Sequence, residues 1–144
     1  MFRHMATLAL ASTPQRQRFV GAPPLERAAV VEAGFPAAVL AGLLRDDAVT
    51  LGDLSGLVAP RRTLERRLAD GARLSADESD RLARFITVLD NTERLFGGTA
   101  AAMDWLRGPK LRFDGRRPLE LLRTDAGTRL VEDVLEQARH GMMA

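Results

Sequence analysis

The arginines between residues 59 and 73 are the side chains best suited to chemistry in this sequence. Arginine presents a planar fork of donors that binds a guanine edge or phosphate oxygens. This segment holds five arginines against Glu65 and Asp70, a net charge of +3, whereas the whole 144-residue chain carries +2. Thr63 can contact a thymine methyl group or a phosphate. The candidate DNA contacts are Arg61, Arg62, Thr63, Arg66, Arg67 and Arg73.

A second interpretation of these arginines stays open, in which they form the solvated face of a helix. Lys110 is the only lysine, so arginine carries nearly all the positive charge of the chain. The distribution of charge favours the first interpretation. Residues 1–74 carry a net charge of +3 and residues 75–144 a net charge of −1. The positive excess therefore lies where a nucleic-acid contact would be sought.

A second group of candidate contacts lies in the C-terminal half. Tryptophan and arginine are favoured where proteins bind one another, and long side chains near a terminus can enter a neighbour's pocket. The candidate protein contacts are Trp105, Phe113, Gln137, Arg139, His140 and Met142. The alternatives are that Trp105 packs in the core and that the last turn is an ordinary solvated C-terminus.

Catalytic and metal-binding chemistry is not expected. The chain has no cysteine, and its two histidines, His4 and His140, lie near opposite ends. No serine stands in a nucleophile motif, and no glycine-rich phosphate loop is present. We therefore expect no enzyme activity and no cofactor. The lack of cysteine and of any apolar run near ~20 residues favours a cytoplasmic protein without a membrane partner.

The elements that would position these residues are all helices, because apolar residues recur at helical spacing and no alternating strand pattern occurs. Thr50 with Asp53, and Ser75 with Glu78, predict capped helix starts. The predicted helices cover 25–33, 36–44, 51–58, 60–69, 76–96, 100–106 and 125–140. The expected buried residues of the long helix and the last helix include Leu82, Phe85, Ile86, Leu89, Phe96 and Leu130.

The two short helices 51–58 and 60–69, joined at Ala59 and Pro60, match the pattern of a helix–turn–helix. In such a motif the second helix enters the major groove of DNA. At about 100° per residue, Leu64 and Leu68 share one face, and Arg66 lies nearly opposite them. The arginines would then face outward while the leucines anchor the helix.

The sequence after Leu74 resembles the toxin-binding domain of the Xre/MbcA/ParS-like antitoxins, and Arg62 to Leu68 resembles their Xre-like helix–turn–helix. The resemblance covers about residues 25–141. The motifs that carry it are Leu74 to Leu82, Glu93 to Gly97, Ala102 to Arg107, Arg117 to Leu122, Thr124 to Gly127 and Val131 to Leu135. The loop from Gly108 to Arg117 departs from the Asn-Pro and small-residue pattern common in relatives.

This resemblance implies a fold of an N-terminal Xre-like helix–turn–helix bundle and a small helical toxin-binding domain. The implied division is a flexible tail at 1–22, a DNA-binding domain at 23–73 and a toxin-binding domain at 74–144. The implied partners are a RES-domain toxin that depletes NAD, operator DNA and a second copy of the chain. A stand-alone transcriptional regulator with a C-terminal dimerisation domain is the alternative, and a structural adaptor that never touches DNA is a third possibility.

Overall fold

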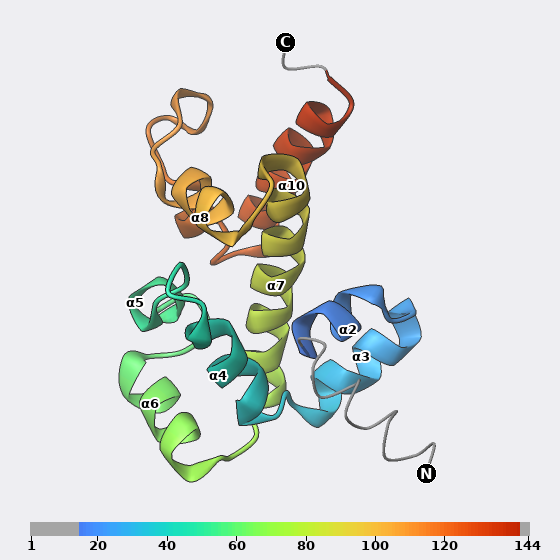
Figure 1. The fold of residues 1–144 in the computed structure, drawn as a ribbon, viewed down its shortest axis with the longest axis vertical. Coiled ribbons are helices and arrows are strands. Elements are labelled where there is room, and N and C mark those ends of the chain that lie inside the picture. The colour runs from blue at the N-terminus through green and yellow to red at the C-terminus, as the bar shows by residue number, and fades with distance from the viewer. Residues whose placement is uncertain (1–14, 142–144) are drawn as a thin grey trace.

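The computed structural model describes residues 15–141 and confirms the predicted all-α architecture for this part of the chain (Figure 1). Within residues 15–141, the β-type backbone pairing consists of one isolated bridge between Ser55 and Ala59. The elements are α2 (Gln15–Gly21), α3 (Pro24–Ala33), α4 (Ala37–Arg45), α5 (Leu51–Leu54), α6 (Arg61–Asp70), α7 (Ala76–Phe96), α8 (Thr99–Arg107), the 3-10 turn η1 (Leu111–Phe113), α9 (Pro118–Leu121) and α10 (Asp125–Arg139).

The long helix α7 is the central element, and it packs against α2, α3, α8 and α10. The predicted capping box starts it: the Ser75 hydroxyl accepts from the Glu78 amide at 3.1 Å, and the Glu78 carboxylate accepts from the Ser75 amide at 2.8 Å. Leu82, Phe85, Ile86 and Leu89 are fully buried. Helix α7 contacts elements from both ends of the chain, so its packing does not mark a boundary between two domains. The division at residue 74 stays a prediction.

The helix–turn–helix region differs from the prediction in its first helix. The structure ends α5 at Leu54 instead of Val58, and the chain then turns through Gly56, whose φ of +78° disfavours other residues. This turn directs Leu57 and Val58 into the core, where both are buried. Burial of those two side chains outweighs continuation of the helix. The predicted cap of α5 is confirmed, since Thr50 and Asp53 form a capping box.

The predicted tail at 1–22 is wrong for its last residues, because Gln15–Gly21 forms α2. Phe19 is buried and meets Phe35 edge to face, with ring centroids 5.0 Å apart. Arg16 also forms an ion pair with Glu93 of α7. These partners are distant in sequence, so local composition did not predict the helix. Residues 1–14 lie outside the described residues.

The C-terminal half explains the Thr-Asp-Ala-Gly motif. The Thr124 hydroxyl caps α10 by accepting from the Gly127 amide at 3.0 Å. A Cβ atom on Gly127 would lie 2.1 Å from the Leu121 carbonyl oxygen, so only glycine permits this approach of α10 to α9. Two expected buried residues are instead on the surface, since Phe96 is 41% and Leu130 54% exposed. Each lies on the helical face predicted from spacing, but its neighbours cover it only in part; Phe96, for example, stacks on Trp105 of α8 and still keeps 41% of its surface exposed.

Among residues 15–141, no single helix combines the length and apolar character that crossing a membrane requires. Helices α3 and α4 meet that test only as a pair, which bends by 104° at the break between them. In α4, Val39, Leu40 and Leu43 are buried in the core.

Candidate functional site

Helix α6 is held so that its arginines face outward. Pro60 precedes its first turn, and Gly71 ends it in the left-handed conformation with φ of +63°. Leu64 is fully buried and Leu68 is partly buried against the core, as predicted. The side chains of Arg62 and Arg66 are exposed and form no hydrogen bond or ion pair with another residue from 15 to 141.

Two neighbours of these arginines form local or partial contacts. The Nε atom of Arg61 lies 3.0 Å from the Glu65 carboxylate, in an exposed pair one turn apart. Such pairs stabilise a helix only weakly and leave the charge accessible. Thr63 is half-buried. The face of α6 that can meet a ligand is therefore formed by Arg61, Arg62, Arg66 and the edge of Thr63.

The other two predicted DNA contacts hold the fold together. Arg67 pairs with Glu78 of the α7 capping box, with Nε 3.2 Å from the carboxylate. Burial acts to raise the pKa of Glu78, but hydrogen bonds from Ser75 and Arg67 outweigh it and lower that pKa overall. Arg73 donates to the Gly34 carbonyl at 2.7 Å. These contacts fix the position of α6 relative to α3 and α7.

Arg107, at the end of α8, joins the C-terminal half to the helix–turn–helix. Its guanidinium donates to both carboxylate oxygens of Asp53, at 2.9 and 2.5 Å, and also to the Ala48 carbonyl. Burial acts to raise the pKa of Asp53, but hydrogen bonds from Arg107 and Thr50 lower it below its usual value. The same pairing raises the pKa of Arg107. This contact orients α5 relative to α8.

Trp105 belongs to an aromatic cluster that is partly open to solvent. Its ring stacks on Phe96 with centroids 5.8 Å apart, and the Lys110 ammonium lies 5.1 Å from the Trp105 centroid. Leu111, the next residue, is 96% exposed at the tip of the loop. Trp105 is therefore half-buried, with one part in the core and one part beside an exposed apolar surface.

Phe113 and Gln137 meet in a hollow of about 430 Å³ between the η1 loop and α10. Leu130, Val134 and Asp133 of α10 also line it. Gln137 is exposed and Phe113 is half-buried. The structure thus brings together two of the predicted protein contacts and adds Leu130 to them.

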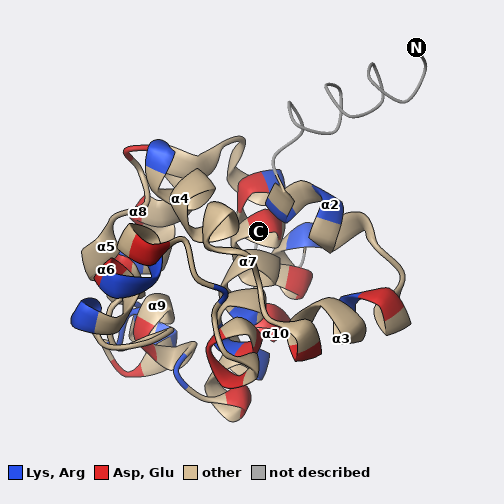
Figure 2. Ribbon diagram, turned by 90° about the horizontal axis from the view of Figure 1, so that it is seen from below, with Lys and Arg blue, Asp and Glu red and all other residues tan. Residues whose placement is uncertain are grey.

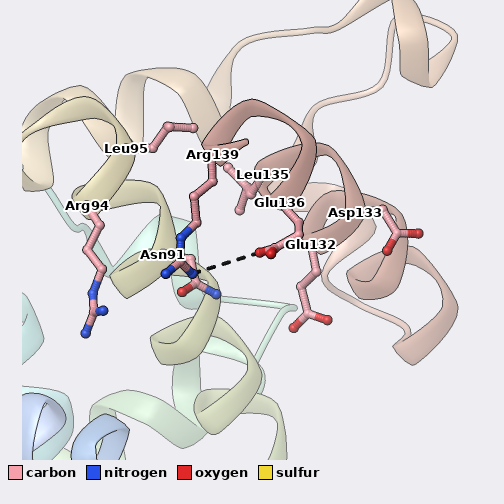
Figure 3. Close-up of a pocket in the computed structure, with 8 residues that line it drawn as sticks. All are labelled: Asn91, Arg94, Leu95, Glu132, Asp133, Leu135, Glu136 and Arg139. Atoms are coloured by element: carbon pink, nitrogen blue, oxygen red, sulfur yellow. Dashed lines mark ion pairs between the residues drawn. The ribbon is translucent and has the colours of Figure 1, made fainter. Parts of the chain in front are cut away.

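Arg139 lines a second hollow, of about 680 Å³, between α7 and α10 (Figure 3). Asn91, Arg94 and Leu95 form the α7 wall, and Glu132, Asp133, Leu135, Glu136 and Arg139 form the α10 wall. Burial, together with the carboxylates of Asp125 and Asp133, raises the pKa of Glu132. The Arg139 guanidinium lies 4.0 Å from Glu136, which also bonds His140 at 2.8 Å. Met142 lies outside the described residues.

The sequence alone did not reveal several residues of these surfaces. Phe96 and Leu130 share the helical faces of buried neighbours, so their spacing predicts burial. Arg107 lies 54 positions from Asp53, and neither residue carries a local signal of the pairing. Phe113 of the charged loop is a predicted contact, and Leu111, an apolar residue between two basic residues, is a similar signal that was missed.

Two family models match the chain in succession. The antitoxin Xre-like helix-turn-helix domain matches residues 26–86, and the antitoxin Xre/MbcA/ParS C-terminal toxin-binding domain matches residues 92–141. These domains belong to non-enzymatic regulators, in agreement with the expectation that the chain is not an enzyme.

Three relatives carry the name antitoxin Xre. The one from Pseudomonas putida is 37% identical over 108 residues, which cover 75% of this chain and 67% of the relative. The one from Yersinia enterocolitica is 36% identical over 86 residues, 59% of this chain and 58% of the relative. The one from Photorhabdus laumondii is 26% identical over 118 residues, 81% of this chain and 80% of the relative. The chain therefore belongs to the Xre/MbcA/ParS-like antitoxins, with a helix–turn–helix followed by a toxin-binding domain.

Proposed function

We propose that this antitoxin inhibits a RES-domain toxin that depletes NAD, and that it represses its own operon by binding DNA through α6. The proposal places it in the cytoplasm as a homodimer, because helix–turn–helix proteins commonly bind paired half-sites as dimers. The observation that carries it is that the two expected binding surfaces remain open at different ends of α7 (Figure 1).

The toxin-facing surface is proposed from the C-terminal half. Phe96, Leu111 and Leu130 are large apolar side chains left exposed there, and each has a charged residue within two positions in the sequence. Exposed apolar area with a polar rim is typical of a protein interface. Arg139 adds a guanidinium that can bind a carboxylate or another anion on the toxin. Gln137, Arg139 and His140 are all exposed on the last turns of α10.

The DNA-facing surface is proposed from α6. Arg62 and Arg66 are exposed and make no ion pair with a described residue, so no internal contact has to break before they bind. A guanidinium can contact a guanine edge or a phosphate without a change of protonation. Arg67 and Arg73 are left out of this proposed surface because their described contacts are structural.

Toxin binding is tested by co-expressing the chain with the RES-domain protein encoded beside it. The two proteins should elute as one complex in size-exclusion chromatography at micromolar concentration. The toxin in this complex should no longer consume NAD. Separate elution with unchanged NAD consumption would contradict the proposal.

DNA binding is tested with a fragment of the chain's own promoter. Arg62→Ala and Arg66→Ala should each weaken operator binding by roughly tenfold or more, the loss expected of a bidentate base contact. Both variants should still co-elute with the toxin. Arg129→Ala is the matched control, because Arg129 is an exposed arginine on α10 that forms an ion pair with Asp125, one turn away. Unchanged operator binding in both α6 variants would reject the groove assignment.

A further inference from the structure

Arg123 lies in the toxin-binding half but reaches the helix–turn–helix. It follows α9, and its terminal Nη2 atom is 3.8 Å from the position that a Cβ atom on Gly56 would occupy. Gly56 belongs to the turn between α5 and α6. The Arg123 side chain is exposed and makes no hydrogen bond or ion pair with another residue from 15 to 141. A guanidinium from one half is therefore placed, without a hydrogen-bonded or ion-paired partner among the described residues, beside the turn that leads into α6.

Other arginines gather near Arg123. Glu120 pairs with Arg117, with Nε 2.5 Å from the carboxylate, and the charges of Arg116 and Arg123 also lower the Glu120 pKa. Three exposed arginines thus surround one carboxylate, which leaves a net charge of +2. We call Arg116, Arg117 and Arg123 the α9 arginines.

The α9 arginines lie on the same side of the molecule as α6. Figure 2 shows α5, α6 and α9 on one side of α7, and α2 and α3 on the other. On α6, Arg61, Arg62 and Arg66 stand against Glu65, again a net charge of +2. Two cationic groups therefore flank the turn at residues 55–59.

DNA bound to such a helix presents phosphates on both sides of it. The major groove is about 12 Å wide and is bounded by the two phosphate backbones. Most protein contacts to DNA are made to these phosphates and sugars, from residues around the inserted helix. Exposed arginines beside the recognition helix, on the same side of the protein, are suited to meet a backbone.

We propose that Arg123, supported by Arg116 and Arg117, is a phosphate-contacting site by which the toxin-binding half itself binds operator DNA. This inference rests on the proposed function, since it requires that α6 binds the operator. It makes the C-terminal half part of the DNA interface as well as the toxin interface.

The test compares Arg123→Ala with Arg129→Ala, both full-length, by titrating a labelled operator fragment at several salt concentrations. Loss of one phosphate contact should reduce the slope of log K against log salt by about 0.9, and weaken binding about eightfold near ~0.1 M salt. Arg123→Glu should weaken binding further, while Arg123→Lys should recover part of the loss. Arg129→Ala should keep the wild-type slope.

The outcomes separate this inference from the proposed function. A wild-type slope in Arg123→Ala and Arg123→Glu, with operator binding intact, overturns only the inference. Loss of toxin co-elution with unchanged operator binding also overturns it, because Arg123 would then belong to the toxin interface. A wild-type chain that binds no operator overturns the proposed function and the inference together. Toxin co-elution of the variants also shows that they are folded.

Discussion

The helix–turn–helix half and the toxin-binding half expose different kinds of side chain. Outward-facing α6 carries Arg62 and Arg66, and its leucines pack inward. The C-terminal half leaves Phe96, Leu111 and Leu130 on the surface, whereas Leu25 in α3 is the corresponding exposed residue of the N-terminal half. A charged face suits a polyanion, and an apolar face suits a folded protein. One helical scaffold thus carries two surfaces of different character, each suited to one of the two proposed partners.

Partly buried carboxylates in the molecule also differ in their neighbours. Asp53 and Glu78 belong to capping boxes and have arginine partners, which lower their pKa values despite burial. Glu120 in α9 also has an arginine partner and a lowered pKa, whereas burial and two neighbouring carboxylates raise the pKa of Glu132 in α10. The charged forms of Asp53 and Glu78 therefore stabilise the fold at neutral pH, while Glu132 carries an electrostatic cost.

The largest expected effect tests whether the two halves share one core. Phe85→Ala should lower the free energy of unfolding by about 3–5 kcal/mol, because Phe85 is fully buried in α7. Denaturant unfolding should show one transition that moves as a whole. Two transitions, only one of them shifted, would instead show that the halves unfold separately.

The next effect tests the contact between the halves. Arg107→Ala should cost about 2 kcal/mol, because it removes hydrogen bonds to a charged group and leaves Asp53 without that partner. Since the folded Asp53 pKa is lowered, its stabilisation is complete above the unfolded value near about 3.9 and is lost as pH falls through the folded value.

The difference between wild type and Arg107→Ala should therefore shrink between pH 7 and pH 3 in urea unfolding. Arg107→Lys keeps the charge but loses the two-pronged geometry, so it should recover only part of the stability. A difference that stays constant over this pH range would argue against the ion pair as its source.

A smaller effect concerns the apolar face of the second half. Phe96→Ala should weaken toxin binding about tenfold, or about 1.4 kcal/mol, because the ring is only partly exposed and stacks on Trp105. Calorimetry with the purified toxin would measure this. Leu25→Ala is the control, since Leu25 is 83% exposed in α3. Equal weakening by both changes would remove the contrast between the two surfaces.

The smallest effect concerns Glu132. Glu132→Gln should raise the free energy of unfolding at pH 7 by up to about 0.5 kcal/mol. The folded pKa of this carboxyl is raised, so the folded state loses stability as pH rises through that value, and the neutral amide avoids the loss. Thermal unfolding at pH 7 would measure it. Asp53→Asn should lower the free energy of unfolding at the same pH. If both substitutions raised it, the proposed difference between Asp53 and Glu132 would be wrong.

Local signals explain which parts of the fold the sequence predicts. Helices α6 and α7 follow from Pro60, Gly71 and the Ser75–Glu78 capping box, which all act within a few residues. The end of α5 and the existence of α2 depend on distant partners, such as Phe35 for Phe19. No local pattern specifies those partners. The sequence therefore does not predict α2, and it predicts an α5 that is longer than the observed one.

The candidate binding residues likewise include some that local sequence predicts and some that depend on distant contacts. The outward direction of Arg62 and Arg66 follows from helical spacing around Leu64. The structural contacts of Arg67 and Arg73 involve Glu78 and Gly34, which the spacing within α6 cannot indicate. The exposure of Phe96 depends on how much of its ring α8 covers through Trp105, which is a property of the assembled fold.

Helix α7 has a consequence for how the antitoxin can be removed. The family match to residues 26–86 ends inside this helix and the match to residues 92–141 begins inside it, and its buried face packs against elements of both domains. Neither fragment of a chain cut within α7 would keep a complete core. A single cleavage there would therefore disrupt the helix–turn–helix and the toxin-binding domain together.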